Sequence, residues 1–105
     1  MPATLVHADG RTEVLGAGPG VPLGVPTRLE RTVEVGHLEP GDVLVLVTDG
    51  VVESRTRDLD QGIERLRQRS VELRDRPLRE VVDGLAALAD TTLQDDVTVM
   101  AARLR

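Results

Sequence analysis

The order of apolar and polar residues predicts strands near both ends of the chain, with helices between them. Residues 3–8 form a short β-like run, an Asp-Gly pair typical of a hairpin turn follows, and residues 12–15 are predicted as the returning strand. Residues 16–26, rich in Gly and Pro, indicate an ordered loop. Residues 28–35 alternate and predict a half-buried strand, whereas the continuous apolar run 43–47 predicts a strand buried on both faces.

Helical spacing follows in the next part of the chain. Asp58 and Gln61 match a capping box, and apolar residues in 59–73 then fall near helical spacing. Pro77 suits the first turn of a second helix. Its predicted buried stripe consists of Leu78, Val81, Val82, Leu85, Leu88 and Ala89. Residues 97–104 predict a last strand, so the chain is predicted to be α+β, with two antiparallel helices packed on a mostly antiparallel sheet.

Composition limits the classes of partner. The chain has 105 residues and a net charge of -5, with 40% apolar residues but no Phe, Tyr or Trp. A negative chain without aromatic side chains is poorly suited to nucleic acid. Without Cys it has no disulfides or thiolate metal ligands, and no apolar run approaches the ~20 residues of a membrane span. We therefore expect a cytoplasmic location, with no nucleic-acid or membrane partner.

One candidate for chemistry is the triplet Thr48-Asp49-Gly50, which ends the most apolar predicted strand. A carboxylate at Asp49 would project from a rigid base into the space beyond the strand. Gly50 has no side chain, so a metal ion, water or phosphate could approach the backbone there. The alternative is that Asp49 only caps the turn, because Asp-Gly is a common turn dipeptide.

A second candidate is Asp95-Asp96, directly before the last predicted strand. Neighbouring side chains on an extended segment point in opposite directions, so only one of the two can face the same side as Asp49. Two carboxylates brought together repel each other, and a divalent cation relieves that repulsion. Oxygen ligands favour Mg²⁺ or Mn²⁺ over zinc. The alternative is a solvated acidic turn.

The remaining polar candidates are interpreted as structural. His7 lies in a predicted strand and His37 before a turn, and neither has a second His at ligand spacing. Glu39, Asp42 and Glu53 are interpreted as solvated or turn residues.

Residues 41–55, GDVLVLVTDGVVESR, are similar to a signature stretch of bacterial PPM-type (protein phosphatase 2C-like) serine/threonine phosphatases. The branch they resemble dephosphorylates anti-sigma-factor antagonists in sporulation and stress-response signalling. Residues 20–25, 62–66 and 94–98 resemble three further family stretches in the same order. Four stretches in the correct order make the resemblance specific, and together they span essentially the whole chain.

The resemblance implies a β-sandwich flanked by helices that binds two Mn²⁺ or Mg²⁺ ions. Asp49 and Asp95 would be metal ligands, with Asp96 in support. The implied activity is metal-dependent hydrolysis of phosphoserine or phosphothreonine in a regulatory protein such as an anti-sigma-factor antagonist. One alternative is a catalytically silent remnant that binds a regulatory partner. Another is a small acidic scaffold domain unrelated to phosphatases.

Members of the phosphatase family also carry an earlier half, in which an acidic Gly-Asp motif supplies the ligand that bridges both metal ions. Residues 1–105 resemble the part that follows it. We therefore expect them to form the C-terminal portion of a PPM-type domain, a partial sandwich without its N-terminal half. The isolated chain is expected to bind Mn²⁺ weakly, to have little or no phosphatase activity, and to self-associate through uncovered sheet edges.

Overall fold

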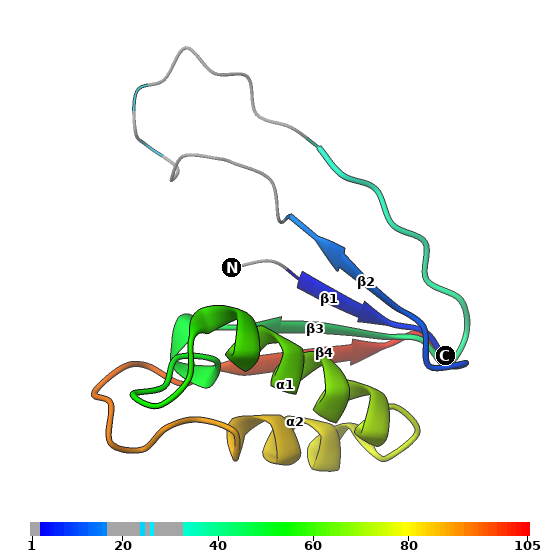
Figure 1. Cartoon of the computed structure of the whole chain (residues 1–105). Helices are drawn as coiled ribbons and strands as arrows, with labels where there is room; N and C mark the ends of the chain where they lie inside the picture. Colours follow the sequence, from blue (N-terminus) through cyan, green and yellow to red (C-terminus); the bar gives the residue numbers. More distant parts are fainter. Residues whose placement is uncertain (1–2, 17–23, 25, 27–32) are drawn as a thin grey trace.

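The chain folds into two layers, a four-stranded sheet and a pair of helices packed on one of its faces (Figure 1). The structure is a computed structural model that describes residues 3–16, 24, 26 and 33–105. Its elements are β1 (Ala3–Val6), β2 (Thr12–Leu15), β3 (Val43–Val47), the 3-10 helix η1 (Asp49–Val51), α1 (Leu59–Leu73), α2 (Leu78–Ala86) and β4 (Val99–Arg103). The predicted α+β fold, with two helices on an antiparallel sheet, is confirmed.

The sheet has the strand order β2-β1-β3-β4, and every neighbouring pair is antiparallel. Strands β1 and β2 form the predicted hairpin, in which the N–H of Gly10 donates to the carbonyl oxygen of His7 at 2.9 Å. Gly10 has a φ of 95°, the left-handed conformation that glycine adopts without steric cost. Strand β3 lies between β1 and β4, with Val45 opposite both Thr4 and Ala101.

The main core cluster lies between the helices and one face of the sheet, while Leu5, which is 1% exposed, is buried on the other face opposite Leu44. The fully buried members of the main cluster are Val43, Val45, Val51, Val52, Leu66, Val81 and Leu85. Along β3 only Val43 and Val45 are fully buried, while Leu44 and Leu46 on the opposite face are half-buried. The prediction that 43–47 is buried on both faces is therefore wrong, because both helices cover the same face.

Both helices begin where their local signals predict. The Asp58 carboxylate accepts the N–H of Gln61 at 2.8 Å, and the Gln61 side chain accepts the N–H of Asp58 at 3.1 Å, which completes the capping box. In α2, Val81 and Leu85 are buried as predicted, whereas Val82 is half-buried. The last two members of the predicted stripe follow the end of α2 at Ala86.

The alternation in residues 28–35 does not produce a strand in the part that the structure describes. Residues 33–35 belong to no strand or helix, and the side chains of Val33 and Val35 are 86% and 78% exposed. They do not pair with β2, although no other described strand occupies its outer edge. At Gly36 the chain instead lies against the side chains of Leu15 and Leu5, on a face of the hairpin. Residues 28–32 and most of the predicted 16–26 loop lie outside the described residues.

Candidate functional site

The end of β3 is tied to the segment that precedes β4 through the side chain of Thr48. Its hydroxyl donates to the carbonyl oxygen of Asp96 at 2.9 Å and accepts the N–H of Thr98 at 2.9 Å. The backbone N–H of Thr48 also donates to the carbonyl oxygen of Thr98, at 3.1 Å. These three bonds bring the segment that carries Asp49 beside the segment that carries Asp95 and Asp96.

Asp49 is the first residue of η1, and its side chain is exposed. Its carbonyl oxygen accepts the N–H groups of Val52 and Glu53, at 3.0 and 2.9 Å. The backbone of Asp49 therefore closes the turn, without a capping bond from a side chain. That role leaves the carboxylate of Asp49 available for a ligand.

Gly50 serves a different purpose from the one its sequence suggested. It is buried, and a Cβ atom at this position would collide with the carbonyl oxygen of Asp96. The space beside Gly50 is therefore filled by the backbone of the facing segment, not left open for a metal ion or phosphate. Glycine is needed here because it allows the two segments to approach closely.

Glu53 joins the two predicted acidic residues. A hydrogen bond between its carboxyl group and that of Asp95 raises the pKa of Glu53, and desolvation and repulsion by Asp95 and Asp49 raise it further. Glu53 was interpreted from the sequence as a solvated turn residue. Its spacing from Asp49 gives no usable signal, because η1 ends at Val51 and the interaction of Glu53 is with Asp95, far away in the sequence.

Asp95 and Asp96 differ in what they contribute. One oxygen of the Asp95 carboxylate accepts the N–H of Asp96 at 2.8 Å, which restricts the orientation of the Asp95 side chain. Asp96 acts through its backbone, because its N–H and its carbonyl oxygen make the two bonds to Asp95 and Thr48. Both side chains are exposed.

The fit of this region to a divalent cation is partial. Asp49, Glu53 and Asp95 offer the hard oxygen donors that Mg²⁺ and Mn²⁺ prefer, and the raised pKa of Glu53 reports an excess of negative charge that a cation would relieve. In residues 3–16, 24, 26 and 33–105, however, no group of three or more acidic or histidine side chains is arranged to hold a metal ion. These described residues therefore offer candidate carboxylate ligands but do not form a metal site by themselves.

A second polar cluster lies at the other end of β3, next to a cavity of about 420 Å³. There the ring of His7 contacts the carboxylates of Asp42 at 2.8 Å and Glu13 at 2.6 Å. Asp42 lies in the turn before β3, as predicted, but it is only 2% exposed and so is not solvated. Neither the burial of Asp42 nor its contact with His7 has a signal in residue spacing, because the two residues lie 35 positions apart, one after β1 and the other before β3.

Comparison with protein-family models matches residues 1–105 to SpoIIE, described as Stage II sporulation protein E. Searches of curated proteins and of solved structures found no match. Within the part of the chain that the structure describes, no helix has the length and apolar character needed to cross a membrane. Because the family match covers all 105 residues, the chain belongs to the SpoIIE family, which is associated with PPM-type phosphatases.

Proposed function

We propose that this chain contributes to a metal-dependent protein serine/threonine phosphatase whose substrate is a phosphorylated regulatory protein, such as an anti-sigma-factor antagonist. The observation that carries the proposal is the set of bonds through which Thr48 holds the segment of Asp49 beside that of Asp95. The raised pKa of Glu53, caused by Asp95 and Asp49, agrees with this proximity. Carboxylates from two distant segments that act on one another at the end of a sheet favour a cation site over a solvated turn. The SpoIIE family match supports the phosphatase assignment.

In this proposal Asp49 and Asp95 are metal ligands for Mn²⁺ or Mg²⁺, with two ions in a complete domain. Such ions polarise a phosphoryl group and activate a water molecule. The other residues position the two ligands. Thr48 holds the two segments together, Gly50 allows their close approach, and the Asp96 N–H orients the Asp95 carboxylate.

A further part of the proposal is that the isolated chain has little activity. Mg²⁺ and Mn²⁺ favour six oxygen ligands in near-octahedral geometry, with waters completing the shell. Two or three carboxylates hold one ion loosely and do not fix two ions at bridging distance. A phosphatase site would then need ligands from additional protein, such as the N-terminal half of a PPM-type domain.

A second candidate function is a catalytically silent module that binds a regulatory partner. The observation that favours it is the sheet face opposite the helices, where the side chain of Met100 is 54% exposed and Leu44 and Leu46 are half-buried. An exposed apolar side chain beside half-buried ones gives this face apolar area for a partner. The phosphatase needs the carboxylates of Asp49 and Asp95 for activity, whereas the silent module does not need them for binding.

The paramagnetic effect of Mn²⁺ on the amide signals of the chain tests the proposal. Mn²⁺ should broaden the signals of residues 48–53 and 94–98 first, and Asp49→Asn and Asp95→Asn should each remove the effect. Asp75→Asn is the matched control, because Asp75 is an exposed carboxylate in the turn between α1 and α2. Broadening that persists in both site variants, or that centres elsewhere, would refute the metal site.

A phosphoester assay on the same samples separates the two functions. We expect little or no Mn²⁺-dependent release of phosphate from a phosphoserine peptide by the isolated chain. Turnover that is abolished by Asp49→Asn would show that 105 residues, or two copies of them, supply a complete site. Partner binding that is unchanged in Asp49→Asn and Asp95→Asn would favour the silent module.

A further inference from the structure

The ring of His7 lies between two carboxylates at the end of the sheet where the β1–β2 hairpin turns. Its Nδ1 atom is 2.8 Å from Oδ2 of Asp42, and its Nε2 atom is 2.6 Å from Oε2 of Glu13. An imidazole ring donates from both nitrogens only when it is protonated, because the neutral ring has one donor and one acceptor. Both contacts are therefore attractive only in the charged form of His7.

The two carboxylates are held very differently. The side chain of Asp42 is 3% exposed, and its two oxygens also accept the N–H of Ala8 and the N–H of Glu39, each at 2.9 Å. The side chain of Glu13 is 52% exposed and belongs to the edge strand β2. Asp42 is thus fixed by the backbone around it, whereas Glu13 can turn into water.

We propose that His7 is a proton-operated latch that fastens edge strand β2 to the turn before β3. With the ring charged, the latch is closed and His7 bridges Glu13 and Asp42. With the ring neutral, Nδ1 keeps its proton and its bond to the fixed Asp42 carboxylate. Nε2 then faces Glu13 as an acceptor, and the Glu13 side chain leaves.

The charges around the ring set the direction of the pH dependence. They come from the hairpin, from the segment before β3 and from the C-terminal end of α1: Asp9, Arg11, Glu13, His37, Glu39, Asp42 and Arg74. Hydrogen bonds to Glu13 and then to Asp42 raise the pKa of His7, against the opposing effects of desolvation and of Arg11. The backbone N–H groups of Glu39 and Ala8 lower the pKa of Asp42, so its carboxylate stays charged while His7 titrates.

The direction of the pH dependence of the latch follows from the shifts in the pKa values of His7 and Asp42. Because the folded chain raises the pKa of His7, the contribution of the closed latch is fully present below the ordinary histidine value of 6.5. That contribution is lost as the pH rises through the raised pKa of His7. The latch therefore opens as the pH becomes alkaline. Glu13 and His7 both line the 420 Å³ cavity, so opening the latch frees the Glu13 side chain to move on the cavity wall.

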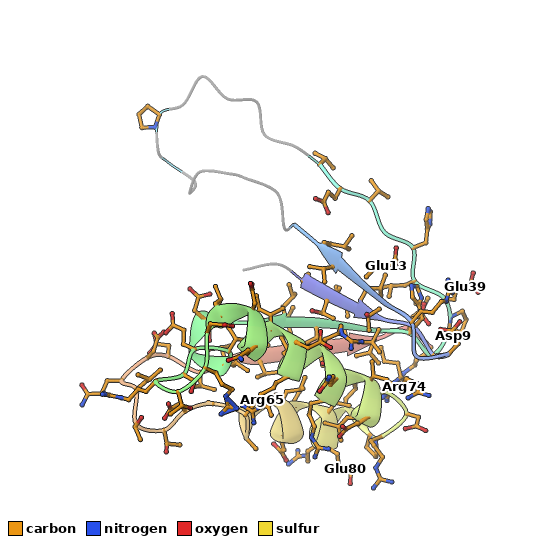
Figure 2. The ribbon with its side chains drawn as sticks, viewed as in Figure 1. Asp9, Glu13, Glu39, Arg65, Arg74 and Glu80 are labelled. Atoms are coloured by element: carbon orange, nitrogen blue, oxygen red, sulfur yellow. The ribbon has the colours of Figure 1, made fainter. Side chains whose placement is uncertain are left out.

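The position of the latch separates it from the proposed metal site. Asp42 precedes the first residue of β3, whereas Asp49 follows its last residue. Asp9, Glu13 and Glu39 gather at the hairpin end of the sheet, near Arg74 (Figure 2). His7, Glu13 and Asp42 therefore act independently of the proposed metal ligands.

A titration of the His7 ring by NMR, combined with amide hydrogen exchange, tests the latch in the intact chain. The chain has two histidines, so the variant His37→Gln leaves the ring signals of His7 alone and also serves as the control. We expect His7 to titrate above 6.5 in the unmodified chain and in His37→Gln, and at a lower pH in Glu13→Gln. Protection of the β2 amides, corrected for intrinsic exchange, should fall across the titration of His7.

The pKa shift of His7 and the change in protection of the β2 amides are linked in size. Each unit by which Glu13 raises the pKa of His7 corresponds to a tenfold change in the ratio of closed to open latch. In Glu13→Gln the protection of β2 should stay the same across the same pH range. The latch is overturned if Glu13→Gln leaves the titration of His7 in place, or if β2 protection in the unmodified chain does not change as His7 loses its proton. Glu13→Gln keeps His7 and the buried Asp42 in place, so the test does not depend on the folding of a His7 variant.

Discussion

At the scale of single residues, Thr48 joins two segments through one hydroxyl group. Thr48→Val keeps the shape of the side chain and removes its bonds to the Asp96 carbonyl oxygen and the Thr98 N–H. Because Thr48 is only half-buried and water can replace part of the loss, we expect the free energy of unfolding to fall by about 1 kcal/mol. Urea denaturation measures the change. Thr91→Val, at an exposed position, is the control, and an equal loss there would contradict the assignment.

Two glycines in the helices provide a matched pair. A Cβ atom on Gly62 would collide with the carbonyl oxygen of Val52, whereas one on Gly84 would meet the end of the flexible Leu73 side chain at 2.5 Å. Gly62→Ala should therefore destabilise the fold by about 1–3 kcal/mol, because a backbone atom must move. Gly84→Ala should lie within about 1 kcal/mol of the unmodified chain, because alanine favours helix and Leu73 can shift. Thermal unfolding of both variants decides the matter, and a reversed order would contradict this account of the packing.

At the scale of elements, α2 holds the helical layer on the sheet. Leu85 is 0% exposed and belongs to the core cluster, so Leu85→Ala should lower the free energy of unfolding by about 2–5 kcal/mol. Leu59→Ala, at a side chain that is 52% exposed on the first turn of α1, should cost much less. Chemical denaturation of the two variants side by side measures the contrast. Similar losses would show that α2 does not pack as described.

The elements that the sequence predicted correctly are those with local signals. The Asp-Gly turn, the capping box at Asp58 and the buried positions Val81 and Leu85 of α2 each depend on residues a few positions apart. The strand predicted for 28–35 was wrong in its described part, because alternation does not show whether a segment pairs along a sheet edge or lies against a face, as the chain does at Gly36. The prediction that Leu44 and Leu46 are buried was wrong for a similar reason. The apolar pattern of residues 43–47 does not show on which face of the sheet the helices pack.

The candidate site was predicted only in part for the same reason. Asp49 and Asp95 could be singled out because each lies next to a predicted strand, and the resemblance to a family supported both. Glu53 could not be singled out, because its interaction with Asp95 exists only once β3 and β4 are paired. The burial of Asp42 depends likewise on the hairpin that supplies His7 and Ala8.

At the scale of the whole molecule, the face opposite the helices should make the chain self-associate. Met100 is 54% exposed on this face, directly opposite Leu46. We expect concentration-dependent association in sedimentation velocity, and Met100→Glu should weaken it because the new charge would have to be desolvated at the contact. Val33→Glu is the control, at a side chain that is 86% exposed outside the sheet. A chain that stays monomeric at all concentrations, or equal effects of the two variants, would contradict this prediction.

Because both helices pack on the same face of the sheet, the positions of β3 should differ in the substitutions that they tolerate. Val43 and Val45 are buried against the helices, while Leu44 and Leu46 alternate with them on the open face. In a saturation mutagenesis experiment scored by folding of the purified chain, tolerance along β3 should therefore rise and fall with a period of two residues. Scored by function in a cell, the tolerant positions should become intolerant wherever another protein surface rests on this face. Positions of β3 that tolerate substitution when scored by folding, but not when scored by function, would identify the residues in that contact.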